Sequence, residues 1–131
     1  MTAIGARPEF VGAAELPRLR VPAGEERDHQ IPLERAAAMT RRYREALGPA
    51  AEKPMLFSRE IFDEILAQAG CAGVRLYLAH DEAGKLTVVL AGVTEHGDDI
   101  LDGVIGEDHL VCPPICPGGV VYDGLSLAYD F

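Results

Sequence analysis

The chain has 131 residues, of which 48% are hydrophobic and 25% charged, and its formal net charge is −9 with a pI near 4.8. This composition excludes disorder throughout and predicts one soluble globular domain with its own core. The acidic balance argues against nucleic acid as a partner, because phosphate contacts need clustered Lys and Arg. There is no apolar run of about 20 residues and no signal-peptide pattern. We therefore expect a cytoplasmic protein without membrane insertion.

Residues 1–30 predict an extended N-terminal arm. Prolines and glycines recur through them, and no hydrophobic period is sustained. The apolar spots at 10–11 and 16–21 are candidates for docking on the domain or on another subunit. The domain itself is expected to span residues 31–131.

A first amphipathic helix is predicted from Pro32 to Leu47, where apolar residues follow helical spacing and Gly48-Pro49 ends the pattern. Basic side chains gather on this helix: Arg35, Arg41, Arg42 and Arg44. Such a cluster is usually a solvated helix face. The alternative is contact with an anionic partner, with the acid-rich C-terminal part of the chain or with a neighbouring copy.

The stretch from Ser58 to Val93 organises the domain. Apolar residues at 61, 62, 65, 66 and 69 form one helical stripe, so a second helix is predicted from Ser58 to Gly70. Ser58 suits the N-cap, and Gly70 suits the left-handed conformation that ends a helix. Phe57 is placed to pack on Phe62 or Ile61 as a hydrophobic staple.

After Gly73 the period changes to two, which predicts a β-hairpin with a turn at 81–84. The returning strand, Leu86–Val93, is apolar on both faces, so we expect it to be central in the sheet. On the first strand, Arg75 and Tyr77 alternate with Val74, Leu76 and Leu78. They either cover a helix flank or form an exposed patch for a partner.

The C-terminal part has a different character. Residues 95–131 contain acidic residues and no Lys or Arg, which favours association with the basic helix. The acidic residues Asp98, Asp99 and Asp102 predict a solvated turn rather than a cation site, because they do not follow the EF-hand pattern. The Asp123-Gly124 pair predicts a hairpin at 120–127 or a tail.

Three interpretations compete for the segment His109 to Pro117, in which prolines restrict the backbone around two cysteines. Cys112 and Cys116 with Cys71 and a histidine, His109, His96 or His80, have the ligand chemistry of a zinc site. A redox dithiol is the second interpretation, although the two-residue spacing is lacking. The third treats the cysteines as small apolar side chains in a rigid loop. Cys71 at a helix C-terminus does not suit a nucleophile.

Three motifs in this order resemble a group of small bacterial proteins of uncharacterised function: MTxxYR at 39–44, FxxExxDxILAQxGCxGVRxY at 57–77 and CPPxC at 112–116. The resemblance covers about residues 31–117. It implies no activity, ligand or catalytic residue for this chain.

Together these patterns predict an α+β fold, with two amphipathic helices packed on a small antiparallel sheet around a central β-hairpin. No set of titratable groups assembles into a catalytic constellation, so we expect a non-enzymatic interaction or assembly module that self-associates, with no cofactor. The arm and the hairpin edge are its expected contact surfaces. The interaction candidates are Arg41, Arg42, Arg44, Arg75 and Tyr77. The alternatives are a zinc or thiol-redox protein with Cys71, His109, Cys112 and Cys116 as metal ligands, and a small-molecule sensor binding between helices and sheet.

Overall fold

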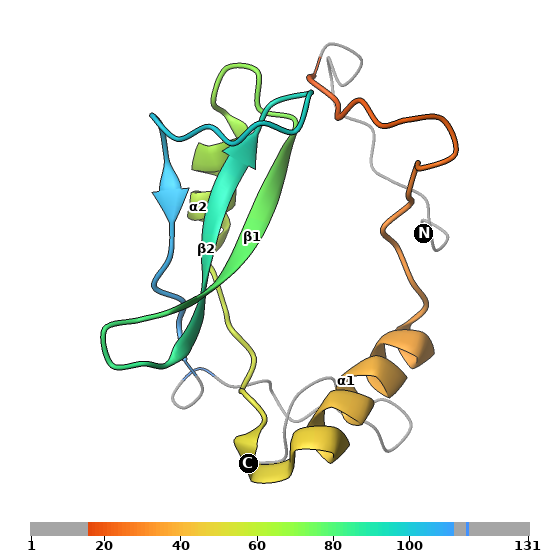
Figure 1. The fold of residues 1–131 in the computed structure, drawn as a ribbon, viewed down its shortest axis with the longest axis vertical. Helices are drawn as coiled ribbons and strands as arrows, with labels where there is room; N and C mark the ends of the chain where they lie inside the picture. The colour runs from red at the N-terminus through yellow and green to blue at the C-terminus, as the bar shows by residue number, and fades with distance from the viewer. Residues whose placement is uncertain (1–15, 112–114, 116–131) are drawn as a thin grey trace. The chain divides into compact units, whose positions relative to one another are not determined.

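The computed structural model describes residues 16–111 and residue 115 (Figure 1). In chain order its elements are α1 (Leu33–Leu47), the 3-10 turn η2 (Gly48–Ala50), α2 (Arg59–Leu66), β1 (Gly73–His80), β2 (Leu86–Val93) and β3 (Ile105–Gly106). The strands form one antiparallel sheet in the order β1-β2-β3. The predicted α+β class is therefore confirmed. None of the helices in this part of the chain is long and apolar enough to cross a membrane.

The chain divides into two compact units. The described part of the first comprises residues 28–55, 111 and 115, and contains α1 and η2. The described part of the second comprises residues 16–27 and 56–110, and contains α2 and the sheet. The second unit holds the hairpin predicted from the sequence.

In the first unit, α1 confirms the predicted amphipathic helix. Pro32 occupies the N-cap, and the helix ends at Gly48, whose φ of 54° is unfavourable for other residues. The backbone N–H of Glu52 donates a hydrogen bond of 2.8 Å to the hydroxyl of Tyr43, which ties the chain after η2 back to the helix. Ala37 is fully buried.

Helix α2 is shorter than predicted, because it stops at Leu66 instead of reaching Gly70. The side-chain amide of Gln68 explains the early end: its nitrogen donates to the carbonyl oxygen of Ile65 at 2.9 Å, and its oxygen accepts from the N–H of Val104 at 2.7 Å. The backbone N–H of Gln68 also donates to the carbonyl of Ile65, at 3.3 Å, so this one residue closes the helix end and attaches it to the loop before β3. Gly70, with φ of 77°, still takes the left-handed conformation.

The start of α2 also differs in detail from expectation. Ser58 is the N-cap residue with extended backbone, but its side chain makes no capping hydrogen bond. The predicted staple is confirmed, because the rings of Phe57 and Phe62 pack edge to face with centroids 6.3 Å apart. Apolar packing rather than a hydroxyl cap therefore fixes the entry of the chain into α2.

The predicted hairpin is confirmed, and its register runs from Gly73 opposite Val93 to His80 opposite Leu86. Its turn closes with a hydrogen bond of 2.9 Å from the N–H of Asp81 to the carbonyl of Lys85. Strand β2 is central in the sheet and almost entirely buried, as its two-sided apolar sequence predicts.

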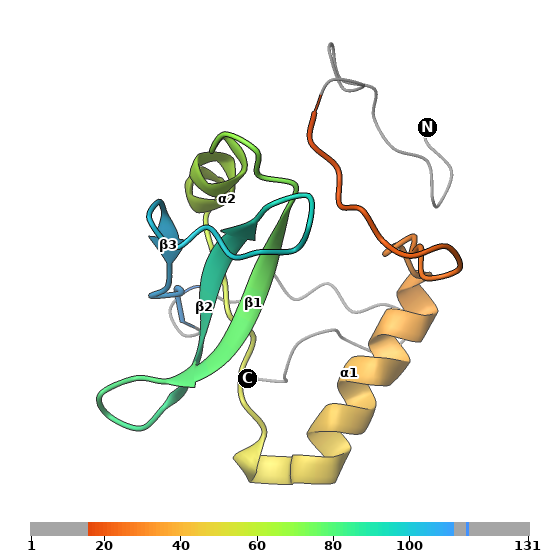
Figure 2. The ribbon, with the colours of Figure 1, turned by 45° about the horizontal axis from the view of Figure 1, so that its top comes forward.

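Helix α2 lies on one face of the sheet, which we call the helix face (Figure 2). Because paired residues point to the same side, this face carries Val74, Leu76 and Leu78 from β1 and Val88, Leu90 and Gly92 from β2. The fully buried side chains of Ile65 and Leu90 form its centre. Glycines allow the close approach: a Cβ at Gly92 would lie 3.1 Å from Ile65, and one at Gly106 would lie 2.8 Å from Ile61.

Residues 16–27 of the predicted N-terminal arm belong to the same unit as the sheet. The N–H of Arg20 donates to the carbonyl of Glu95 at 2.8 Å, and their side chains form an exposed ion pair at 3.2 Å. Leu19 lies at the start of β1, 3.4 Å from the position of a Cβ on Gly73. Residues 16–20, together with Gly70, Thr94 and Glu95, line a hollow of about 600 Å³.

The close approach of α2 predicts that Gly92→Ala destabilises the protein. The added Cβ would lie 2.9 Å from the Cys71 sulfur and 3.0 Å from the Gln68 nitrogen. We expect a loss of about 1–3 kcal/mol in the free energy of unfolding, as is usual for overpacking. Denaturant titration measures it. Gly73→Ala is the control, because its nearest contacts, at 3.4 Å, are ordinary; equal losses in the two variants would contradict the prediction.

Candidate interaction surface

The outer edge of β1 is open in the part of the chain that the structure describes. The strand order places β1 at one side of the sheet, with β2 as its neighbour (Figure 1). The N–H of Asp81 donates to the carbonyl of Lys85, the residue that continues the register opposite it, so these two residues form a hydrogen-bonded pair. Hydrogen-bonded and non-hydrogen-bonded pairs alternate along an antiparallel ladder. The odd-numbered residues of β1 therefore direct their N–H and C=O groups to β2, and the even-numbered residues direct theirs outward.

A bond on the other side of β2 supports this assignment. Gly92, which is opposite Val74, accepts a hydrogen bond of 2.8 Å from the N–H of Ile100. Its carbonyl thus points away from β1, as it does in a non-hydrogen-bonded pair. Four residues of β1 present backbone groups to the outer edge: Val74, Leu76, Leu78 and His80.

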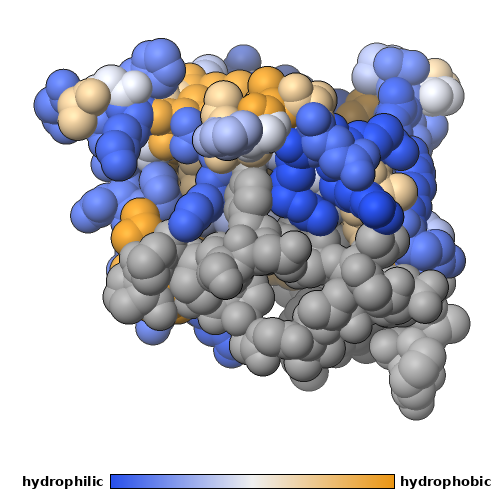
Figure 3. Space-filling view, turned by 90° about the horizontal axis from the view of Figure 1, so that it is seen from below, coloured by the Kyte–Doolittle hydropathy of each residue, from blue (hydrophilic) through white to orange (hydrophobic). Residues whose placement is uncertain are grey.

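Two large apolar side chains accompany this edge on the helix face. Leu76 is 59% exposed and Leu78 is 78% exposed. Helix α2 contacts both β1 and β2, yet it leaves these two leucines largely exposed. Leu78 also lines a hollow of about 250 Å³ with Ala79, His80 and Leu86. Hydrophobic side chains are also exposed in the upper part of the view in Figure 3. Neighbouring exposed apolar side chains such as Leu76 and Leu78 are typical of interaction sites.

On the opposite face, Arg75 and Tyr77 meet at Asp99. The Arg75 guanidinium lies 2.5 Å from one carboxylate oxygen, and the Tyr77 hydroxyl donates to the other. The hydrogen bond from Tyr77, then the bond and charge of Arg75, lower the pKa of Asp99 below its ordinary value of 3.8. Asp99 in turn raises the pKa of Arg75. The two predicted interaction residues are thus held by a third residue of the same chain.

A tight turn positions Asp99 for this contact. The N–H of Thr94 donates to the carbonyl of Asp98 at 2.8 Å, and the N–H of Gly97 donates back to Thr94 at 2.9 Å. Gly97 has a φ of 82°, which favours glycine, and a Cβ there would lie 3.8 Å from the Arg75 guanidinium. The turn after β2 therefore folds close to the side chains of β1.

The edge of β1 lacks the features that usually protect an edge strand. It contains no proline and no lysine, and its eight residues pair with β2 without interruption. Its one arginine, Arg75, is bound to Asp99. Natural edge strands are typically blunted by charge, proline or a bulge. An edge without them is available for pairing with another strand.

The predicted metal ligands do not converge in the described part of the chain. Cys71 is buried, and its thiol lies 3.3 Å from the carbonyl of Gly73 and close to Gly92, on the helix face. His109 lies 3.2 Å from the hydroxyl of Thr87, on the opposite face and five residues along β2 from Gly92. One ion cannot contact both. Among the described residues no group of three His, Cys, Asp or Glu is arranged to hold a metal. Cys112 and Cys116 lie outside those residues.

The contact of His109 belongs to a small polar cluster that the sequence did not predict. The hydroxyl of Thr87, which is 3% exposed, donates to a carboxylate oxygen of Glu107 at 2.9 Å. The ring of His109 also packs near that of Phe57, with centroids 6.1 Å apart. The only signal in the sequence was a hydroxyl in an otherwise apolar strand. Burial leaves this hydroxyl inaccessible to a substrate, so the cluster satisfies a buried polar group.

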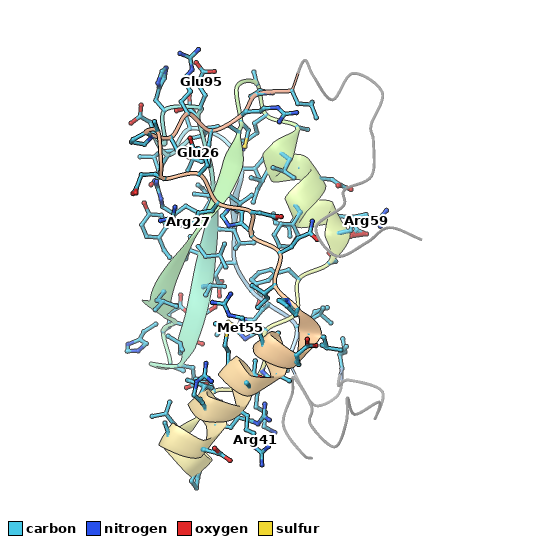
Figure 4. All side chains as sticks on the ribbon, turned by 90° about the vertical axis from the view of Figure 1, so that its right-hand side faces the viewer. Glu26, Arg27, Arg41, Met55, Arg59 and Glu95 are labelled. Atoms are coloured by element: carbon cyan, nitrogen blue, oxygen red, sulfur yellow. The ribbon has the colours of Figure 1, made fainter. Side chains whose placement is uncertain are left out.

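The other predicted interaction residues, Arg41, Arg42 and Arg44, lie on α1 in the first unit. Arg41 projects from the helix (Figure 4) and pairs with Glu45 one turn later at 3.2 Å. Such exposed pairs at i and i+4 contribute little to stability, about 0.3–0.5 kcal/mol. The C-terminal segment expected to meet this helix lies largely outside the described residues.

Comparison of the chain with protein-family models, curated proteins and solved structures finds no match.

The contacts of Asp99 predict a pH-dependent contribution to stability. Because its pKa is lowered in the folded protein, the contribution is fully present above the ordinary value of 3.8 and is lost as the pH falls through the folded value. Asp99→Asn should therefore destabilise the protein at pH 7, and its difference from the wild type should shrink below about pH 4. Denaturant unfolding across this range measures the effect.

Asp98→Asn is the matched control, because Asp98 is an exposed neighbour whose carboxylate makes none of these contacts. A constant difference between wild type and Asp99→Asn from pH 7 to pH 3 would contradict the proposed role of the charge.

Proposed function

We propose that this protein is a non-enzymatic assembly module that binds another copy of itself through the outer edge of β1. The observation that supports this function is the edge itself, with outward backbone groups on alternate residues and the exposed Leu76 and Leu78 beside them. Strand addition at such an edge gains affinity from main-chain hydrogen bonds and specificity from the alternate side chains.

The titratable clusters in the described region favour an association role over catalysis. The Asp99 carboxylate is occupied by Arg75 and Tyr77, and its side chain is only 16% exposed. The hydroxyl of Thr87 is buried between Glu107 and His109. Each cluster is satisfied within the chain, whereas the outer edge of β1 leaves apolar side chains and backbone amides open. Those are the groups that bind protein.

Charge also favours β1 as the contact region. The chain carries a net charge of −9, so two copies repel each other at long range. Strand β1 contains no acidic residue, and a contact centred on it keeps the acidic side chains away from the interface. The repulsion between exposed charges weakens beyond about 8 Å at physiological ionic strength. Association should therefore strengthen when salt is raised from low to physiological levels.

Leu78→Lys should abolish or strongly weaken self-association. Burying a leucine contributes about 1.5–3 kcal/mol, and a two-fold contact contains the leucine twice. A loss of about 3 kcal/mol corresponds to a roughly hundredfold higher dissociation constant. Sedimentation equilibrium over a range of concentrations measures that constant.

Leu101→Lys is the matched control. Leu101 is 75% exposed, close to the 78% of Leu78, but it lies in the loop before β3 instead of on β1. It should leave the dissociation constant unchanged. A wild-type protein that stays monomeric at all concentrations, or equal weakening by both variants, would refute the proposed function.

A further inference from the structure

We infer that two copies pair antiparallel through β1 about a two-fold axis at Tyr77, giving a closed dimer with one continuous six-stranded sheet. This inference rests on the proposed function and adds the partner's register. It follows from three properties of β1: its side-chain alternation, the direction of its free backbone groups and its length.

The alternation of side chains restricts the position of the axis. A two-fold axis perpendicular to the sheet carries each face onto the same face of the partner. Paired residues in an antiparallel ladder also point to one face, so an even-numbered residue must pair with an even-numbered one. The axis therefore passes through a residue and never between two residues. A shift of one residue in the pairing would place the leucines of one copy against the opposite face of the other.

The free backbone groups and the length of β1 select the residue. The outward groups belong to Val74, Leu76, Leu78 and His80, so these must form the hydrogen-bonded pairs across the new interface. With the axis at Tyr77, Leu76 pairs with the partner's Leu78, and Val74 pairs with the partner's His80. All four outward residues then find partners. An axis at Leu76 leaves His80 opposite Ala72, which lies outside the strand.

This register matches side chains on both faces. On the helix face, Leu76 and Leu78 of one copy meet the partner's Leu78 and Leu76, which joins two exposed leucines per copy into one cluster of four. On the other face, Tyr77 lies directly opposite the partner's Tyr77 in a non-hydrogen-bonded pair, where side chains are closest. Arg75 lies opposite the partner's Ala79. No pair of like charges faces across the interface.

The arrangement also closes the assembly. A two-fold contact uses the β1 edge of both copies, so no free β1 remains for a third. At the other side of the sheet, the chain after β3 pairs with Leu56: Leu110 donates to Leu56 at 2.7 Å, and Leu56 donates back at 3.3 Å. The edge strand on that side, β3, has only two residues, and very short edge strands are poor sites for strand addition. A dimer, rather than a fibre, is the expected product.

Cysteine cross-linking tests the register in the full chain. The test starts from a cysteine-free background variant with Cys71→Ala, Cys112→Ser and Cys116→Ser. Sedimentation first establishes that this variant still associates. In this background Tyr77→Cys places two thiols opposite each other at about 4.5 Å between Cα atoms, within the range of a disulfide. Oxidation with diamide should link most of the Tyr77→Cys protein into covalent dimers.

Ala79→Cys is the matched control on the same face. In the proposed dimer the two introduced thiols at position 79 would lie four residues apart along the strands, about 13 Å, which is too far for a disulfide. We expect at least tenfold less cross-linking than for Tyr77→Cys. Because Tyr77→Cys also removes the contact with Asp99, a second pair avoids that position. An equal mixture of Leu76→Cys and Leu78→Cys places unlike thiols in a hydrogen-bonded pair at about 5.5 Å between Cα atoms, so diamide should join them. Either variant alone places its thiols at diagonal positions about 7–8 Å apart, which is too far for a disulfide.

The outcomes separate the register from the proposed function. If the background associates and Ala79→Cys cross-links, the proposed register is wrong but self-association stands. The same conclusion follows if the background associates and neither Tyr77→Cys, Ala79→Cys nor the mixture cross-links. A protein that is monomeric throughout overturns both.

Discussion

The packing of α2 against the central strand is the constraint on which the rest of the structure depends. Gly92 and Gly106 remove the side chains that would hold the helix away, so Ile61 and Ile65 approach the sheet backbone closely. An eight-residue helix is only about 12 Å long, so it covers only part of the face formed by β1 and β2. The core is therefore complete around Leu90, while the apolar side chains of β1 at the flank remain in contact with solvent.

Asp99 determines the character of the strand left at that flank. A free arginine on an edge strand keeps other strands away, because pairing would desolvate its charge. In this protein Arg75 is already neutralised within the chain, together with the hydroxyl of Tyr77. Asp99, in the turn after β2, thus holds the Arg75 guanidinium on the face of the sheet opposite to Leu76 and Leu78.

Patterns that act over a few residues were sufficient to predict the elements. The second helix, the staple of Phe57 and the two-sided apolar β2 all correspond to what the structure contains. Of the predicted apolar stripe only Ile65 is fully buried, whereas Phe62 and Leu66 are exposed. The contacts of Asp99 with Arg75 and Tyr77 were not predicted, because they join residues 22 and 24 positions apart through a turn whose direction no local pattern specifies. The same holds for the early end of α2, which results from Gln68 reaching Val104 across 36 residues.

The two-sided hydrogen bonding of Gln68 couples parts of the molecule that are distant in sequence. Its amide group holds the last turn of α2 with one atom and the backbone before β3 with the other. Neither segment can detach without leaving a polar group of the other unpaired, which costs about 1–3 kcal/mol in a partly buried setting. The helix terminus and the third strand should consequently open as one cooperative event, so their amide protons would exchange with solvent at similar rates.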